Sequence, residues 1–304
     1  MKMKKFIAVL SMAAMIGTLA VGCGKSNEES KGEDAKVEAG SDWDSSMDIT
    51  IVSREDGSGT RGAFIELFGV EEKQGDEKVD MTTEEAQITN STSVMLTTVA
   101  GDEYAIGYVS LGSLDDSVKA VKIDGAEATA ENIKNDSYKV SRPFNIATKK
   151  GLDNEVAKDF INFIMSKEGQ EVVAENGYIG DDSAAAFSGS NPSGKVVVGG
   201  SSSISPVMEK LIEAYKAVNA NAEIELQTTD STTGMTSAID GSYDIGMASR
   251  ELKDEEAAEL DSQVIATDGI AVIVNKANTT DELSGDQVKA IYTGEALTWD
   301  EVVE

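Results

Sequence analysis

Two kinds of hydrophobic pattern alternate along most of the chain. Short runs of apolar and β-branched residues are typical of buried strands, and apolar residues recurring every three or four positions are typical of one helix face. The expected strands are residues 49–53, 105–109, 118–123, 144–148, 196–198, 224–227, 244–247 and 270–275. Apolar helix faces are expected over residues 64–68 and 156–164, a further helix opens at residues 205–206, and another covers residues 232–239. This alternation predicts α/β layers with mainly parallel sheets, which bind ligands at the carboxyl ends of their strands.

The length of the chain indicates two domains. It has 304 residues, 40% of them hydrophobic, and a domain commonly takes about 100–200 residues. Residues 181–194 are rich in Ser, Ala and Gly and form the clearest internal linker.

The N-terminus carries the pattern of an export signal. Lysines precede an apolar run over residues 6–21, which is too short to span a bilayer comfortably. Residues 1–22 are therefore predicted to be a signal peptide. The sequence LAVGC at residues 19–23 resembles a bacterial lipobox, which implies lipidation of Cys23. An ordinary signal with an incidental cysteine is the alternative. The polar residues 23–47 are expected to form a flexible tether.

Composition excludes several classes of protein. The chain has 26 Lys and Arg against 55 Asp and Glu, a formal net charge of −29, which argues against binding nucleic acid or anionic membrane surfaces. It has no His, so the usual base of serine and cysteine hydrolases is missing. With a single Cys it has neither a disulfide framework nor a cysteine zinc site. No cofactor or metal is expected.

Three loops share one plan, in which a strand is followed by small hydroxyl residues or glycine and then by a helix. They are residues 53–60, 200–203 and 229–234. Free backbone N–H groups and the dipole at a helix N-terminus favour an anion there. Arg54 adds a guanidinium suited to an oxyanion, and Asp56 is positioned to hold it. Taken singly, each signal more often has a structural explanation: a Ser or Thr before a helix is a cap, Arg54 is a surface ion-pair residue, and Asp56-Gly57 is a turn.

The sequence as a whole resembles the substrate-binding proteins of phosphate ABC transporters, the PstS family. The resemblance rests on segments such as ITIVSREDGSGTRGAF, VVVGGSSSISPVMEKLIEAY and DGSYDIGMASRELKDEE, and covers nearly all of residues 48–304. The family usually begins with the GGSSSISP half, whereas here the REDGSGT half comes first. The chain therefore resembles a circularly permuted member, whose two ends should lie together on one lobe.

The resemblance implies a two-lobed, periplasmic-binding-protein-like α/β fold with two hinge strands. One lobe would comprise residues 48–142 and 277–304, and the other residues 143–276. The hinge strands would lie near residues 143–148 and 269–276.

The resemblance also implies a phosphate site between the lobes. Its ligands would be Arg54, Ser58, Gly59, Thr60, Ser202, Ser203, Thr232 and Ser249. Arg250 would be either a ligand or an ion-pair residue at a helix start. A carboxylate that accepts the phosphate proton would favour phosphate over sulfate, with Asp268 and Asp230 as candidates.

The expected function is that of a receptor on the extracytoplasmic face of a bacterial, Gram-positive cell membrane. A lipid anchor would hold this monomeric protein at the membrane, and it would pass inorganic phosphate to the permease and ATPase of an ABC importer. A receptor for sulfate, molybdate or another oxyanion is one alternative. A hydrolase or phosphotransferase with Ser58 as nucleophile is another, although a base and a nucleophile elbow are missing.

Overall fold

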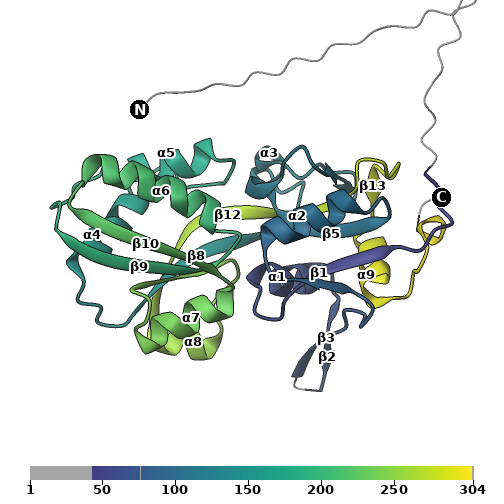
Figure 1. Ribbon diagram of the computed structural model, residues 1–304, viewed down its shortest axis with the longest axis horizontal. Coiled ribbons are helices and arrows are strands. Elements are labelled where there is room, and N and C mark those ends of the chain that lie inside the picture. Colours follow the sequence, from purple (N-terminus) through teal and green to yellow (C-terminus); the bar gives the residue numbers. More distant parts are fainter. Residues whose placement is uncertain (1–42, 76, 303–304) are drawn as a thin grey trace, which may run out of the picture. The chain divides into compact units, whose positions relative to one another are not determined.

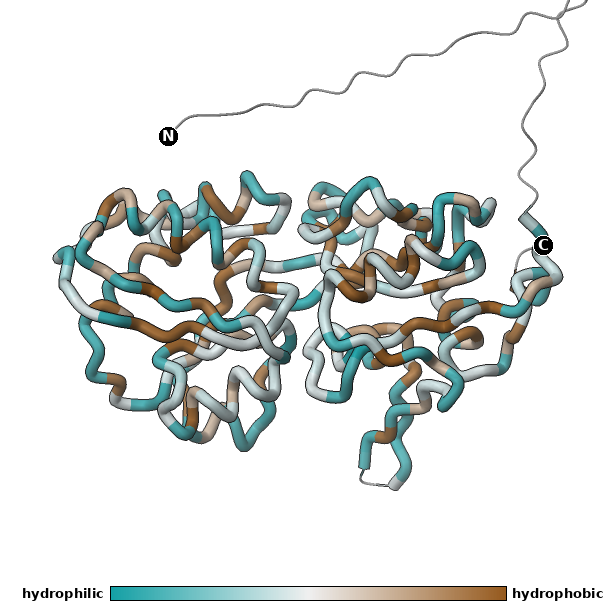
Figure 2. The backbone as a smooth tube through the Cα atoms, viewed as in Figure 1, coloured by the Kyte–Doolittle hydropathy of each residue, from teal (hydrophilic) through white to brown (hydrophobic). Residues whose placement is uncertain are grey.

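Two separate hydrophobic cores organise the folded part of the chain. The computed structural model describes residues 43–75 and 77–302, so the predicted signal peptide, Cys23 and most of the predicted tether lie outside the described residues. Buried residues from 49–140 and 270–302 form one core, and most buried apolar residues from 144–266 form the other. A small third cluster around Met235 and Leu260 lies within this second stretch. We call these parts lobe A (residues 43–140 and 270–302) and lobe B (residues 144–266). In Figure 2 the most hydrophobic stretches follow the central strands of each lobe.

Lobe A is built on three strands that run parallel to one another, β1, β4 and β5. The element bounds are β1 Thr50–Arg54, α1 Gly59–Leu67, β2 Glu71–Gln74, β3 Glu77–Asp80, β4 Gln87–Thr89, α2 Thr92–Gly101, β5 Ala105–Ser110, β6 Lys119–Ala120, β7 Lys122–Ile123, α3 Ala130–Lys134, β13 Glu282–Leu283 and α9 Gly285–Thr293. Short 3-10 helices, η1 and η2, cover Leu111–Ser113 and Trp299–Glu301.

Lobe B has the same kind of parallel arrangement around β9, which pairs with β10 and β11. Its elements are β8 Ser141–Lys149, α4 Glu155–Ile164, α5 Lys167–Glu175, β9 Gly194–Ser201, α6 Ser205–Val218, β10 Ala222–Thr229, α7 Ser231–Asp240, β11 Ile245–Ala248 and α8 Asp254–Glu259. Together with lobe A this confirms the predicted α/β fold class.

One long strand belongs to both lobes. β12 (Leu260–Val274) pairs antiparallel with β8 over its first part and antiparallel with β5 over its last part (Figure 1). The sheet has the order β10-β9-β11-β8-β12-β5-β1-β4, and a ninth strand, β6, pairs with the last part of β12. The sequence predicted only residues 270–275 as a strand here, because residues 261–264 are exposed and lack an apolar run. Since residues 270–274 pack in the core of lobe A, the predicted assignment of residues 270–276 to the other lobe is wrong.

Several elements of lobe A are not predicted by the hydrophobic pattern, or are predicted differently from what the structure has. The hairpin β2–β3 is charged and mostly exposed. α2 contains threonines and valines, which are weak helix formers, but it packs closely on β5: a Cβ added to Gly107 would lie 2.5 Å from Met95 Sδ. Residues 118–123 form two short strands, β6 and β7, that pair with different partners, rather than the single strand predicted.

The two ends of the described chain lie side by side, as the sequence predicted. Backbone bonds join Ile49 to Leu297, Trp299 to Met47 and Asp300 to Ser45. Trp43 packs edge-on against Trp299, with ring centroids 5.8 Å apart. Residues 43–47, which the sequence assigns to the tether, are therefore packed against lobe A. Among the described residues, no helix is long and apolar enough to cross a membrane.

Candidate functional site

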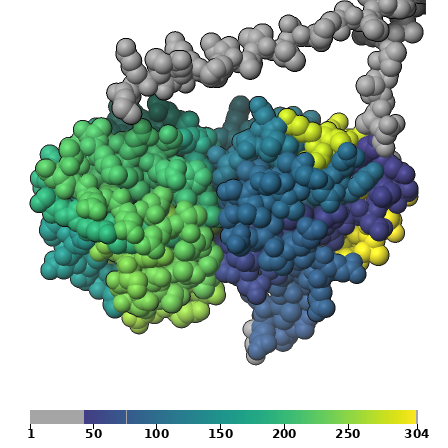
Figure 3. Space-filling model, in the orientation of Figure 1, coloured from purple at the N-terminus to yellow at the C-terminus, as the bar shows by residue number. Residues whose placement is uncertain are grey.

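Loops from both lobes meet where parallel strands end. In lobe A, β1 leads into the loop 54–60 at the start of α1, and β4 leads to the start of α2. In lobe B, β9 ends at Ser201 shortly before α6, and β10 ends at Thr229 shortly before α7. β11 ends at Ala248. On the face that Figure 3 shows, the green residues of lobe B touch the blue residues of lobe A. This places several helix N-termini around one interface.

Hydroxyl groups from the two lobes are hydrogen-bonded to each other in this interface. Thr60 Oγ1 lies 2.7 Å from Ser203 Oγ, and Thr92 Oγ1 lies 3.2 Å from Ser202 Oγ. Arg54 Nη2 donates to Ser202 Oγ at 3.1 Å. All five residues are at least nine-tenths buried. The sequence-predicted residues Arg54, Thr60, Ser202 and Ser203 are therefore brought together.

Ser249 extends this group within lobe B. Ser201 Oγ donates to Ser249 Oγ at 2.9 Å, and the backbone N–H of Ser249 donates to Ser231 Oγ at 3.1 Å. Both Ser231 and Ser249 are fully buried. We call the seven hydroxyl residues the hydroxyl cluster: Thr60, Thr92, Ser201, Ser202, Ser203, Ser231 and Ser249.

Gly59 brings the backbone of lobe A against this cluster. It is the first residue of α1, and a Cβ added to it would lie 2.4 Å from Ser231 Oγ and 2.8 Å from Ser249 Oγ. Only a residue without a side chain fits so close, so the positive end of the α1 dipole approaches the hydroxyl groups directly. Ser58 is the N-cap of α1, where its side chain accepts from the backbone N–H of Arg61.

The guanidinium of Arg54 is held by Glu55 rather than by Asp56. Arg54 Nε and Nη2 each donate to a carboxylate oxygen of Glu55 at 2.8 Å. Asp56 is 97% exposed and pairs with Arg61 at 2.9 Å. The prediction that Asp56 holds Arg54 is wrong, because the loop turns the Asp56 side chain outward while that of Glu55 is partly buried against the guanidinium.

Thr232 and Arg250 lie at the rim of the interface and not in the cluster. The backbone N–H and the hydroxyl of Thr232 both donate to the carbonyl oxygen of Gly57, at 3.2 and 3.3 Å. Arg250 makes a two-bond ion pair with Glu256, at 2.7 and 2.8 Å, and has a longer contact with Thr232. The sequence left open whether Arg250 is a ligand or an ion-pair residue, and in the structure it forms an ion pair with Glu256.

Neither candidate proton acceptor contacts the cluster. Asp230 caps α7, with one oxygen accepting from the backbone N–H of Thr233 at 2.8 Å and the other from its hydroxyl at 2.6 Å. Asp268 is buried and pairs with Arg142 at 3.1 Å, directly across β12 and β8. Burial raises the pKa of Asp268 to about 6, although Arg142 acts in the opposite direction. Within the described residues, no carboxylate is hydrogen-bonded to a cluster hydroxyl.

The ligands predicted from the sequence leave out three members of the cluster, Thr92, Ser201 and Ser231. Ser201 is the last residue of β9, within the predicted loop 200–203. Ser231 lies in the predicted loop 229–234, next to the predicted ligand Thr232, and α7 turns the Ser231 side chain toward the cluster. Thr92 follows the N-cap Ser91 of α2, a helix that the sequence pattern does not predict. For Thr92 and Ser231 the available signal is a hydroxyl residue in the first turn of a helix that follows a strand.

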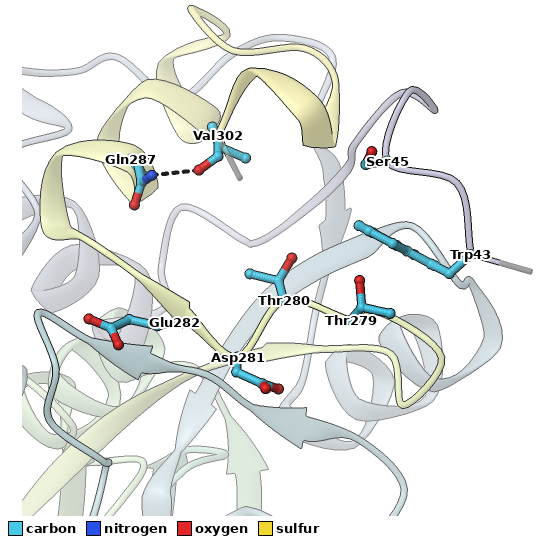
Figure 4. Close-up of a pocket in the computed structure, with 8 residues that line it drawn as sticks. All are labelled: Trp43, Ser45, Thr279, Thr280, Asp281, Glu282, Gln287 and Val302. Atoms are coloured by element: carbon cyan, nitrogen blue, oxygen red, sulfur yellow. Dashed lines mark hydrogen bonds between the residues drawn. The ribbon is translucent and has the colours of Figure 1, made fainter. Parts of the chain in front are cut away.

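A second polar site lies wholly in lobe A. A pocket of about 650 Å³ is lined by Trp43, Ser45, Thr279, Thr280, Asp281, Glu282, Gln287 and Val302. Figure 4 shows the side-chain amide of Gln287 donating to the carbonyl of Val302, with Asp281 and Glu282 on the opposite side of the pocket. None of its residues belongs to the hydroxyl cluster. In the described part of the chain, no group of three or more acidic or Cys side chains is arranged to hold a metal ion.

Comparisons with known proteins identify the family of this chain. The family described as a PBP superfamily domain matches residues 10–168 and 185–303. A protein of Streptococcus agalactiae named "Phosphate-binding protein PstS 2" is 55% identical over 99% of both chains. The chain belongs to the PstS family. Another PstS 2, from Streptococcus pneumoniae serotype 4, is 41% identical over 99% of this chain and 100% of its own.

The PstS family also includes a close structural relative. The crystal structure of a phosphate-binding protein of a phosphate ABC transporter from Streptococcus pneumoniae is 43% identical to this chain. It covers 84% of this chain and 100% of its own, with a TM-score of 0.67. This agreement confirms the predicted periplasmic-binding-protein-like fold. The relatives are named as binding proteins and not as enzymes, as was expected from the sequence.

Proposed function

We propose that this protein captures inorganic phosphate between its two lobes and delivers it to the permease and ATPase of an ABC importer. The observation that carries the proposal is the buried hydroxyl cluster, in which Thr60 and Thr92 of lobe A meet Ser202 and Ser203 of lobe B beside Arg54. The names of the PstS relatives support the same ligand.

Binding would replace hydroxyl–hydroxyl contacts by contacts to phosphate oxygens. Arg54 Nη2 now donates to Ser202, and the Thr60 and Ser203 hydroxyls donate to or accept from each other. A phosphate oxygen is a stronger acceptor for each of these donors because it carries charge. Hydrogen bonds to charged groups contribute about 1.5–3 kcal/mol each, so several such bonds suffice for micromolar affinity, about −8.2 kcal/mol.

The electrostatics of the site come from neutral dipoles more than from net charge. Glu55 offsets the charge of Arg54 through two hydrogen bonds. The N-termini of α1 and α7 add partial positive charge, with Gly59 and Ser231 as their first residues. The acidic surface opposes binding only weakly, since exposed charges are screened over about 8 Å at physiological salt.

A receptor for sulfate or another oxyanion is the second candidate. It is favoured by one observation, that no carboxylate is bonded to the cluster within the described residues. Hydroxyl groups can both donate and accept, so the cluster can accept a hydrogen bond from the P–OH group of phosphate, but it lacks the negative charge that would repel sulfate.

Calorimetric titration with phosphate, sulfate and molybdate separates the two candidates. We expect phosphate to bind with micromolar or lower Kd and sulfate at least tenfold more weakly. Comparable affinity for sulfate would defeat the phosphate assignment. The hydrolase alternative is weaker, because Ser58 caps α1 and the chain has no His. Phosphatase turnover that Ser58→Ala abolishes would restore it.

The proposed location is the extracytoplasmic face of a Gram-positive cell membrane, with lipid on Cys23 and residues 24–42 as the tether. The protein would act as a monomer, and its membrane contact would be through the lipid only. Replacement of Cys23 by Ser should release the protein into the culture medium. Retention of that variant in the membrane fraction would contradict the lipid anchor.

We also propose that the order of the two halves is circularly permuted relative to the usual family order. The pairing of residues 45–49 with residues 297–300 supports this proposal, because permutation requires chain ends that are neighbours.

A further inference from the structure

We propose that Gly57 of lobe A, together with Asp230 and Thr232 of lobe B, forms a latch that holds the lobes closed over the ligand. The latch is a positioning device and makes no contact with the ligand. The inference rests on the proposed capture of phosphate, because phosphate affinity is its main readout.

The first component of the latch is a backbone contact between lobes. The carbonyl oxygen of Gly57 accepts from the backbone N–H of Thr232 at 3.2 Å and from its hydroxyl at 3.3 Å. Thr232 lies in the first turn of α7, where backbone N–H groups have no partner within the helix. The carbonyl of lobe A therefore occupies the positive end of a lobe B helix.

The second component is a close approach that only glycine permits. A Cβ added to Gly57 would lie 2.3 Å from Oδ1 and 2.6 Å from Cγ of Asp230. The Asp230 carboxylate cannot easily swing away, because both of its oxygens accept from Thr233. The φ angle of Gly57 lies outside the left-handed region, so its backbone conformation alone would tolerate alanine. Glycine is required here by the closed interface and not by the turn.

The position of the latch separates it from the binding groups. Gly57, Asp230 and Thr232 are partly exposed, whereas the cluster residues Ser231 and Ser249 are fully buried. Ser231 is also flanked by Asp230 and Thr232 in the chain. When the latch docks α7 against lobe A, it therefore brings the Ser231 hydroxyl to the face of Gly59. A change at Gly57 alters closure without removing any donor to the ligand.

The test is a set of four variants measured by calorimetry with inorganic phosphate. Gly57→Ala should lower phosphate affinity at least tenfold. Gly62→Ala is the matched control, because a Cβ at Gly62 would have only one neighbour, Arg250 Cδ at 3.9 Å. The phosphate affinity of Gly62→Ala should stay within twofold of the native value. Asp230→Ser keeps a helix-capping oxygen but removes the carboxylate. In the Asp230→Ser background, the further change Gly57→Ala should lower phosphate affinity by less than threefold.

Two further measurements exclude other causes. The melting temperature of Gly57→Ala without phosphate should equal that of the native protein, because neither core changes. Small-angle X-ray scattering should give a larger radius of gyration for Gly57→Ala than for the native protein in saturating phosphate. Affinity within twofold of native for Gly57→Ala, or a loss that is equally large in the Asp230→Ser background, would overturn the latch.

The outcomes distinguish the latch from the proposed function. If the native protein binds phosphate and Gly57→Ala binds equally well, only the latch fails. If the native protein does not bind phosphate, the proposed function fails. The latch is then judged by scattering without ligand, where Gly57→Ala must still be more open than the native protein and Gly62→Ala must not.

Discussion

Thr60 Oγ1 lies 2.7 Å from Ser203 Oγ, although 143 positions separate the two residues in the chain. Each belongs to a segment that enters a helix at the carboxyl end of a parallel strand, Thr60 in lobe A and Ser203 in lobe B. Two equivalent loops from different lobes thus face each other. A ligand between them would be bound by both lobes at once, which couples binding to closure.

Replacement of Arg54 should weaken phosphate binding. Arg54→Ala removes a charged donor and leaves the Glu55 carboxylate unpaired beside an anion, so we expect at least a tenfold loss, or about 1.4 kcal/mol. Arg54→Lys should be intermediate, because lysine keeps the charge but cannot make the two-bond contact to Glu55. Calorimetry checks both variants, with the exposed Lys210→Ala as the control. Unchanged affinity in Arg54→Ala would remove this residue from the site.

Ser231 should contribute more to binding than its neighbour Thr232. Ser231→Ala removes a buried hydroxyl that also accepts from the backbone of Ser249, so phosphate affinity should fall about tenfold. Thr232→Val loses only the hydroxyl at the rim and keeps the backbone bond to Gly57, so the loss should be under threefold. A larger effect of Thr232→Val would reinstate the sequence-based assignment of Thr232 as a ligand.

The buried pair of Asp268 and Arg142 should give the free energy of unfolding a specific pH dependence. Burial raises the pKa of Asp268 to about 6, above the value near 3.9 of an unfolded chain. Between these values the folded state binds more protons, so the contribution of Asp268 to stability falls as pH rises from about 4 to about 6.

Urea titrations of the native protein and of Asp268→Asn at several pH values check this prediction. Arg142, Tyr178 and Ser110 face Asp268 and are unchanged in that variant. The native free energy of unfolding, taken relative to the variant, should decrease by about 1–3 kcal/mol over this interval. A difference that increases with pH would show that Asp268 is instead stabilised as a carboxylate in the folded state.

The strands with continuous apolar runs could be predicted from the sequence, because such runs indicate a strand that is buried. β1, β5, β9 and β11 are buried along most of their length, and strands buried on both faces are mostly apolar wherever they are placed. The first part of β12 could not be predicted in this way. Its residues 261–263 are exposed and polar, and they form a strand only because β8 supplies hydrogen-bonding partners.

For the site, the sequence was enough to predict the loops but not which residue of each loop points inward. The loops 53–60, 200–203 and 229–234 could be selected from their hydroxyl and glycine content, which favours helix N-termini and anions. Whether Ser231 or Thr232 faces inward depends on the rotation of α7, and whether Glu55 or Asp56 holds Arg54 depends on the path of the loop after β1. Adjacent residues of similar chemistry carry no local signal that distinguishes them.

The alternation of strands and helices, the family and the set of loops that could hold an anion were predictable from the residues, because they depend on the chemistry of neighbours in the chain. The fold was needed to show which hydroxyl groups meet, where β12 passes from one lobe to the other and why a side chain at Gly57 would not fit. Those features are contacts between segments far apart in the chain, and their geometry is set by how the two lobes pack against each other.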